Sequence, residues 1–136
     1  MTRRKRYIPR DIRVPTLIAM KVTPEVGISQ HMALTALVGG WAGKAQFNAL
    51  GECCNLLAQG ADIEQDKEAD NMAGLGEAAL SNIKERYLST GLFTSTDEDI
   101  GALTIMVEFS EDWWNRRGGT TFHAAYTAMR AEEATA

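Results

Sequence analysis

The chain has 136 residues, of which 45% are hydrophobic and 24% are charged, and its formal net charge is −4. This length and composition are typical of one globular domain that buries its own core without disulfides or metals. The uncharged apolar stretch over residues 17–20 is far too short for a signal-peptide core or a membrane span, so we expect a cytoplasmic protein.

The charge is unevenly divided along the chain. Residues 1–13 hold six basic side chains and one acidic one, a net +5, whereas the rest of the chain carries −9. Such a cationic segment commonly binds phosphate backbones or an acidic partner. The alternatives are that it docks on the acidic body of its own chain or serves as a targeting signal. The six candidate binding residues are Arg3, Arg4, Lys5, Arg6, Arg10 and Arg13.

The first helix is expected after this arm. An apolar run lies between Pro15 and Pro24, which suits an extended segment laid across the body. Ser29 is then the expected N-cap of a short helix that ends at Gly39-Gly40. Trp41 follows in a glycine-flanked loop and is a candidate interface residue, because exposed tryptophans often anchor binding.

Two longer helices are expected next. The first lies between Gly43 and Gly60, with Phe47, Leu50, Cys54 and Leu57 on one face. The second starts near Asp62 and ends before Gly91. Within it Asp62, Asp66 and Asp70 recur every four residues, and like charges at this spacing cost stability. We therefore interpret the three aspartates as a face that meets a basic partner.

The window Asp66–Glu77 also has the frame of a calcium-binding loop. It carries acidic residues at positions 1, 3, 5 and 12, but the sharp turn at position 6 normally needs glycine and here falls on Asn71. The helical pattern from Met72 onward also continues through the window. The sequence therefore favours an acidic helix over a metal site.

The last two helices have clear start signals. Ser95 to Glu98 has capping-box spacing, and Thr120 or Thr121 would cap the final helix. Adjacent helical residues are about 100° apart, so with Trp114 in the core Trp113 is expected on the flank, partly exposed, as a second interface candidate. The sequence predicts an all-α bundle of five helices, with a basic arm over residues 1–15, a helical domain over 16–130 and a frayed tail over 131–136.

Catalytic and metal-binding patterns are weak. Cys53 and Cys54 are neighbours, so they form neither a C-x-x-C pair nor a staple between distant segments. His31 and His123 lack the companions of common metal motifs, and no nucleophile stands beside an obvious base. A pairing of Cys54 with a histidine in space stays open. We expect a protein that is not an enzyme and needs no cofactor or metal.

Four short strings carry a resemblance. They are R-K-R-Y-x-P-R at the N-terminus, FNALGECCNLLAQG, IKERYLSTGLF and TSTDEDIGAL. Together with the layout, they resemble small helical proteins encoded by tailed bacteriophages and prophages of proteobacteria. The resemblance implies a mobile-element protein in a bacterial cytoplasm that works by binding, for instance by blocking a host defence complex or by regulating transcription or replication. It assigns no activity and therefore no functional residues.

Three functions are consistent with these patterns. In the leading one, Trp41, Trp113 and the acidic face dock on a host protein or protein–nucleic-acid complex, and the arm adds electrostatic contacts. In the second, the chain is a small DNA- or RNA-binding regulator that uses the arm and forms a homodimer. In the third, the acidic body imitates nucleic acid and occupies a basic groove of another protein.

Overall fold

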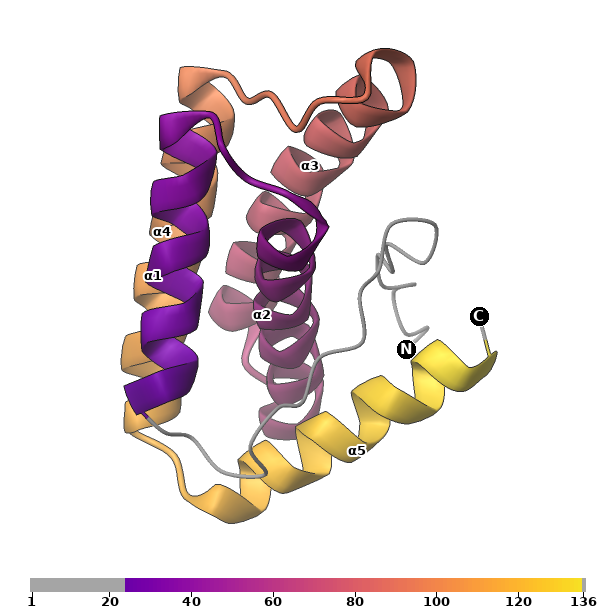
Figure 1. Ribbon diagram of the computed structural model, residues 1–136. Coiled ribbons are helices and arrows are strands. Elements are labelled where there is room, and N and C mark those ends of the chain that lie inside the picture. The colour runs from indigo at the N-terminus through magenta and orange to yellow at the C-terminus, as the bar shows by residue number, and fades with distance from the viewer. Residues whose placement is uncertain (1–23, 136) are drawn as a thin grey trace.

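The computed structural model describes residues 24–135, with side chains from Ser29 onward. Within this range the chain forms five helices and no strand (Figure 1): α1 (Pro24–Gly39), α2 (Lys44–Glu64), α3 (Lys67–Thr90), α4 (Asp97–Asn115) and α5 (Gly119–Thr135). The predicted all-α class is confirmed for these residues. The predicted basic arm lies outside the described residues, as does the extended segment up to Pro24.

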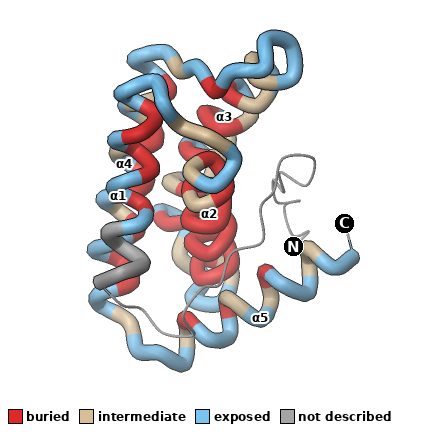
Figure 2. Tube along the Cα trace, in the orientation of Figure 1, coloured by how far each residue is buried: buried red, intermediate tan, exposed pale blue. Residues whose placement is uncertain are grey.

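Helix α2 is the centre of the bundle. It packs against α1, α3, α4 and α5, and α3 and α4 also pack against each other. Figure 1 shows α1 and α4 side by side, with α5 crossing α2 near the C-terminal end of α2. Every residue from Leu50 to Ala61 is buried, as the red tube of α2 shows in Figure 2. A helix buried on all sides forms the core around which the others pack.

Helix α1 ends as predicted but begins earlier. Ser29 is not its N-cap, because the helix already starts at Pro24, and proline is favoured in a first helical turn. At the other end Gly40 adopts a left-handed φ of 80°. Its N–H donates to Leu37 O at 3.3 Å, and Trp41 N–H donates to Ala36 O at 3.0 Å. This Schellman motif terminates α1 at the predicted Gly39-Gly40.

The corner between α2 and α3 differs from the prediction. Helix α2 continues through Glu64, and Gln65 then takes a left-handed conformation with φ 55° and ψ 43°. Asp66 is the N-cap of α3, and its side chain accepts a hydrogen bond from Ala69 N at 3.1 Å. The expected single acidic helix face is therefore wrong, because Asp62 lies in the last turn of α2, whereas Asp66 caps α3 and Asp70 lies in its first turn.

The predicted capping box of α4 exists one residue later. Thr96 Oγ1 accepts from Asp99 N at 3.1 Å, and Asp99 Oδ2 accepts from Thr96 N at 3.1 Å. Asp99, and not Glu98, is the acidic partner in this capping box, because its buried carboxylate also pairs with Arg86 of α3. Helix α5 begins at Gly119, before both predicted caps, and continues through Thr135 into the tail that was expected to fray.

The predicted exposure of Trp113 is wrong. Both Trp113 and Trp114 are buried, at 1% and 5% exposure, with their rings edge to face at a centroid distance of 4.8 Å. Gly60 of α2 makes room for both, since a Cβ there would lie 2.8 Å from the Trp113 ring and 2.9 Å from the Trp114 ring. Trp113 also donates its indole N–H to Asp66 Oδ2 at 2.8 Å. Both tryptophans at the end of α4 are thus core residues.

Candidate functional site

Trp41 is the predicted interface residue that the structure leaves accessible. It lies in the α1–α2 connection and is 60% exposed. Its backbone is fixed by the hydrogen bond to Ala36 that ends α1. Its indole lies against Gly39, where a Cβ would come within 2.8 Å of the ring atoms Cδ1 and Nε1. The glycine therefore allows the ring to rest on the end of the helix in a defined position.

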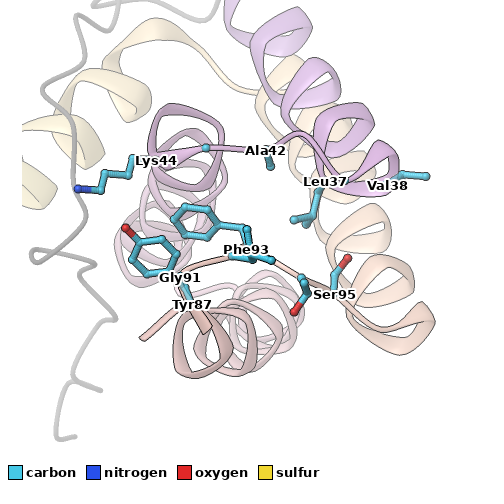
Figure 3. A pocket seen from close by; sticks show the side chains of 12 residues that line it. Leu37, Val38, Ala42, Lys44, Tyr87, Gly91, Phe93 and Ser95 are labelled. Atoms are coloured by element: carbon cyan, nitrogen blue, oxygen red, sulfur yellow. The ribbon is translucent and has the colours of Figure 1, made fainter. Parts of the chain in front are cut away.

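A cavity of about 500 Å³ opens beside this loop. Its walls come from the end of α1, the start of α2 and the α3–α4 connection (Figure 3). Phe93 stacks on Tyr87 at a ring-centroid distance of 4.1 Å and on Phe47 at 5.2 Å, so the base of this region is a rigid aromatic stack. The side chain of Lys44 points away from the cavity in Figure 3. The volume is that of a site for a small ligand or for a few side chains of a partner.

Exposed apolar side chains gather around the cavity. Val38 is 66% exposed and Leu92 is 64% exposed, and both line the cavity. Leu88, in the last turn of α3, is 61% exposed. We refer to Val38, Trp41 and Leu92 as the Trp41 patch. Three well-exposed apolar residues beside a cavity are typical of a binding surface, because a single domain gains nothing in stability from leaving them in water.

The acidic corner is distant from this patch. Asp62, Asp66 and Asp70 lie where α2 ends and α3 begins, whereas Trp41 precedes the start of α2. A helix rises about 1.5 Å per residue, so the 21 residues of α2 separate the two sites by about 30 Å (Figure 1). The structure does not bring Trp41 and the three aspartates together into one contact surface.

Asp66 has a structural role within that corner. Its carboxylate accepts hydrogen bonds from the Trp113 indole and the Ala69 backbone, and Arg117 lies 3.5 Å away. The Trp113 hydrogen bond is the main cause that holds the pKa of Asp66 below its ordinary value of 3.8, followed by the Ala69 backbone bond. Arg117 also stacks over the Trp113 ring at 3.8 Å.

The cysteines and histidines occupy different environments. Burial raises the pKa of Cys53 to about 12, and its S–H donates to Met106 Sδ at 3.6 Å. Cys54 is buried and donates its S–H to Ala73 O at 3.0 Å. His31 Nε2 contacts Glu111 Oε2 at 3.0 Å on the surface, and His123 is exposed on α5. Among residues 29–135, the structure shows no hydrogen bond between a thiol and an imidazole.

The calcium-loop frame is not a loop in the structure. Helix α3 begins at Lys67 and continues through the remainder of Asp66–Glu77. Within the described part of the chain, no group of three or more histidine, cysteine or acidic residues is placed to hold a metal ion. No helix in that part is both long and apolar enough to cross a membrane.

No family model, curated protein or solved structure matches the chain. The candidate site is therefore identified from the structure of the chain alone.

Sequence reasoning found Trp41 but missed the residues around it. Its signal was the pair of glycines beside a large aromatic residue, which forced a loop. Leu92 had a similar signal, since it directly follows Gly91 in a helix-ending position. Val38 had none, because it continues the apolar pattern of α1 and appeared to be a core residue.

Proposed function

We propose that the chain is a protein-binding domain without enzymatic activity that docks on a host protein or protein–nucleic-acid complex through the Trp41 patch. The observation that carries this proposal is the position of Trp41, a large aromatic side chain at 60% exposure on a fixed loop. The resemblance to phage and prophage proteins supplies the expected setting, the cytoplasm of a proteobacterial host.

The energetics favour an anchor at this position. A tryptophan buries up to about 250 Å² in an interface and needs few rotamers to be fixed. Here the Schellman motif and the contact with Gly39 already restrict the ring, so binding would cost little additional conformational entropy. The neighbouring cavity offers a partner a place for apolar side chains of its own. Truncation of such an anchor typically costs at least about 2 kcal/mol of binding free energy.

The contribution of the three aspartates is narrower in this proposal than the sequence suggested. A partner held by the Trp41 patch would have to extend about 30 Å along α2 to reach them. Asp66 is engaged with Trp113, Ala69 and Arg117. We therefore place the primary contact at the Trp41 end. The predicted basic arm over residues 1–15 would add electrostatic attraction.

Affinity capture from a proteobacterial lysate tests the proposal. The wild-type chain, Trp41→Ala and Ile105→Ala would be immobilised at equal density, and the retained proteins quantified by mass spectrometry. Ile105 is the matched control, because it is also a large exposed apolar residue, at 50%, but lies within α4. We expect one or a few proteins that wild type and Ile105→Ala retain and Trp41→Ala loses.

Two other outcomes would redirect the proposal. If Trp41→Ala retains the same proteins as wild type, the Trp41 patch is not the docking surface. If nuclease treatment of the lysate removes the captured material from all three chains, the regulator function that uses the arm on DNA or RNA takes its place. A salt series would then show the steep loss of affinity that phosphate contacts produce.

A further inference from the structure

Two non-helical connections form much of the wall of the cavity beside the Trp41 patch. The α1–α2 connection contributes Gly40, Ala42 and Gly43, and the α3–α4 connection contributes residues 91–95. Figure 3 shows Ala42 on the first connection and Ser95 on the second, with the cavity between them in this view. A ligand in the cavity therefore lies against backbone as well as against side chains.

Backbone groups on both walls have no hydrogen-bond partner. Among the hydrogen bonds of residues 24–135, none involves the backbone N–H or C=O of Ala42 or Ser95, and both residues are half-buried. The neighbouring Gly43 differs, since its N–H donates to Gln46 Oε1 at 2.8 Å. A backbone group that loses contact with water needs another partner. A ligand that fills the cavity must therefore supply donors and acceptors at Ala42 and Ser95.

The side chains beside these backbone groups are apolar. Leu37 and Phe93 line the cavity at 5% and 8% exposure, and Phe93 is held in place by its stack on Tyr87. The cavity thus combines an apolar interior with unpaired backbone at its walls. An extended peptide matches this combination, because its backbone donors and acceptors lie between its side chains. Pairing of such a peptide with exposed backbone is a recurring mode of recognition.

Charge around the cavity selects among such peptides. Of the described residues that line it, only Lys44 is charged, and its side chain points away from the cavity in Figure 3. Asp97 and Glu98 follow the wall residue Ser95 at the start of α4, are exposed, and take part in no ion pair among the described residues. The positive end of the α4 dipole offsets only about half a charge. This rim is therefore negative and complements a basic side chain.

We propose that the cavity beside the Trp41 patch binds an extended segment of the partner protein in which an apolar residue lies next to lysine or arginine. The apolar side chain would occupy the cavity, the segment's backbone would hydrogen-bond to Ala42 and Ser95, and the basic side chain would face the two carboxylates at the start of α4. This inference rests on the proposed function, since it names the part of the partner that the Trp41 patch holds.

Peptide selection against the full chain tests this inference. A phage-displayed library of random linear peptides is selected on the immobilised wild-type chain, and one enriched peptide is synthesised and titrated by fluorescence anisotropy. We expect the enriched peptides to share an apolar residue next to lysine or arginine. The affinity of the synthetic peptide is then compared between variants of the two walls and of the rim.

Ser95→Pro tests the backbone contact, because proline has no N–H to donate. Ser95→Ala is the matched control, since it loses the hydroxyl but keeps the N–H. We expect the peptide to bind Ser95→Pro at least about fivefold more weakly than Ser95→Ala. The double variant Asp97→Asn/Glu98→Gln should weaken binding at low salt and have little effect at high salt, whereas Glu108→Gln, an exposed carboxylate elsewhere on α4, should leave it unchanged.

Amide exchange in the wild-type chain keeps the test informative if circular dichroism shows that Ser95→Pro does not fold. The backbone N–H groups of Ala42 and Ser95 should exchange at least about fivefold more slowly with the peptide bound than without it. Unchanged exchange at both positions would overturn the proposal. So would a selection that enriches no peptide, enriched peptides without lysine or arginine, or equal affinity of Ser95→Pro and Ser95→Ala.

Failure of this inference differs from failure of the proposed function. If the captured partner is lost by Trp41→Ala but binds Ser95→Pro and Ser95→Ala equally, the Trp41 patch docks a folded surface and the extended segment is wrong. If the selected peptide binds Trp41→Ala like wild type but loses affinity for Ser95→Pro, the cavity binds a peptide and docking through Trp41 is wrong.

Discussion

Replacing Asp66 should destabilise the fold more than replacing any other acidic surface residue of the α2–α3 corner. Its two carboxylate oxygens serve different donors: Oδ1 accepts from Ala69 N at the start of α3, and Oδ2 accepts from the Trp113 indole at 2.8 Å. Asp66→Ala removes both acceptors at once. Asp66→Asn keeps one oxygen but places an N–H group against a second donor.

The expected loss follows from these contacts. An N-cap is worth about 1 kcal/mol, and a buried indole N–H left without an acceptor costs about 1–3 kcal/mol. The ion pair with Arg117, at 3.5 Å and partly exposed, adds less than about 1 kcal/mol. Because such terms are not strictly additive, we expect Asp66→Ala to lower the free energy of unfolding by about 2–4 kcal/mol. Asp66→Asn should fall between Asp66→Ala and wild type.

The effect should depend on pH in a definite direction. The pKa of Asp66 is lower in the folded state than its ordinary value of 3.8, so the ionised carboxylate stabilises the fold. This contribution is fully present above the unfolded-state pKa and is lost as the pH falls through the folded-state pKa. The difference in stability between wild type and Asp66→Asn should therefore be constant near neutral pH and shrink below about pH 4.

Urea unfolding followed by tryptophan fluorescence measures these differences. Asp112→Ala is the matched control, because Asp112 is an exposed acid whose Arg116 pair is a surface helical pair of small worth. The reasoning would be refuted if Asp66→Ala and Asp112→Ala unfolded at the same urea concentration. It would also fail if the wild type and Asp66→Asn converged at neutral pH instead of at acid pH.

Three further predictions follow from packing, capping and burial. Gly60→Ala should lower the free energy of unfolding by about 1–3 kcal/mol in a thermal melt, because its methyl group would meet the rings of Trp113 and Trp114 at 2.8–2.9 Å. Gly101→Ala should raise it by about 0.5–1 kcal/mol, because a methyl group at this exposed position of α4 meets nothing within 4 Å. Thr96→Ala should lower the free energy of unfolding by about 1 kcal/mol in urea and Thr96→Ser much less, since serine keeps the capping hydroxyl. The thiol of Cys53 should not react with a disulfide reagent near neutral pH until the protein unfolds, and rapid modification of the native chain would contradict its burial and its raised pKa.

The sequence predicted most helices because their ends carry local signals. Gly40 and Gly91 both adopt the left-handed φ that ends a helix, near 80°, and glycine at such positions is visible in the sequence. The corner at Gln65 was not predicted, because no glycine marks this helix end in the sequence. Glutamine carries no preference for the left-handed conformation, and here tertiary contacts of Asp66 with Trp113 stabilise the break.

The environment of the site depended on contacts distant in sequence. Trp113 was expected on the surface because adjacent helical residues diverge by about 100°, but Gly60, 53 positions earlier, gives its ring a buried place. The burial of four polar residues of α2, Asn48, Glu52, Asn55 and Gln59, depended on distant contacts in the same way. Their burial follows only from the number of elements that surround the central helix, which spacing along one helix does not reveal.

The most direct test of the Trp41 patch is calorimetric titration of the captured partner with three chains. Wild type, Trp41→Ala and Ile105→Ala would be titrated at one salt concentration. We predict that Trp41→Ala binds at least about 30-fold more weakly than wild type, the equivalent of about 2 kcal/mol, and that Ile105→Ala binds like wild type. Equal affinity of wild type and Trp41→Ala would contradict docking through Trp41.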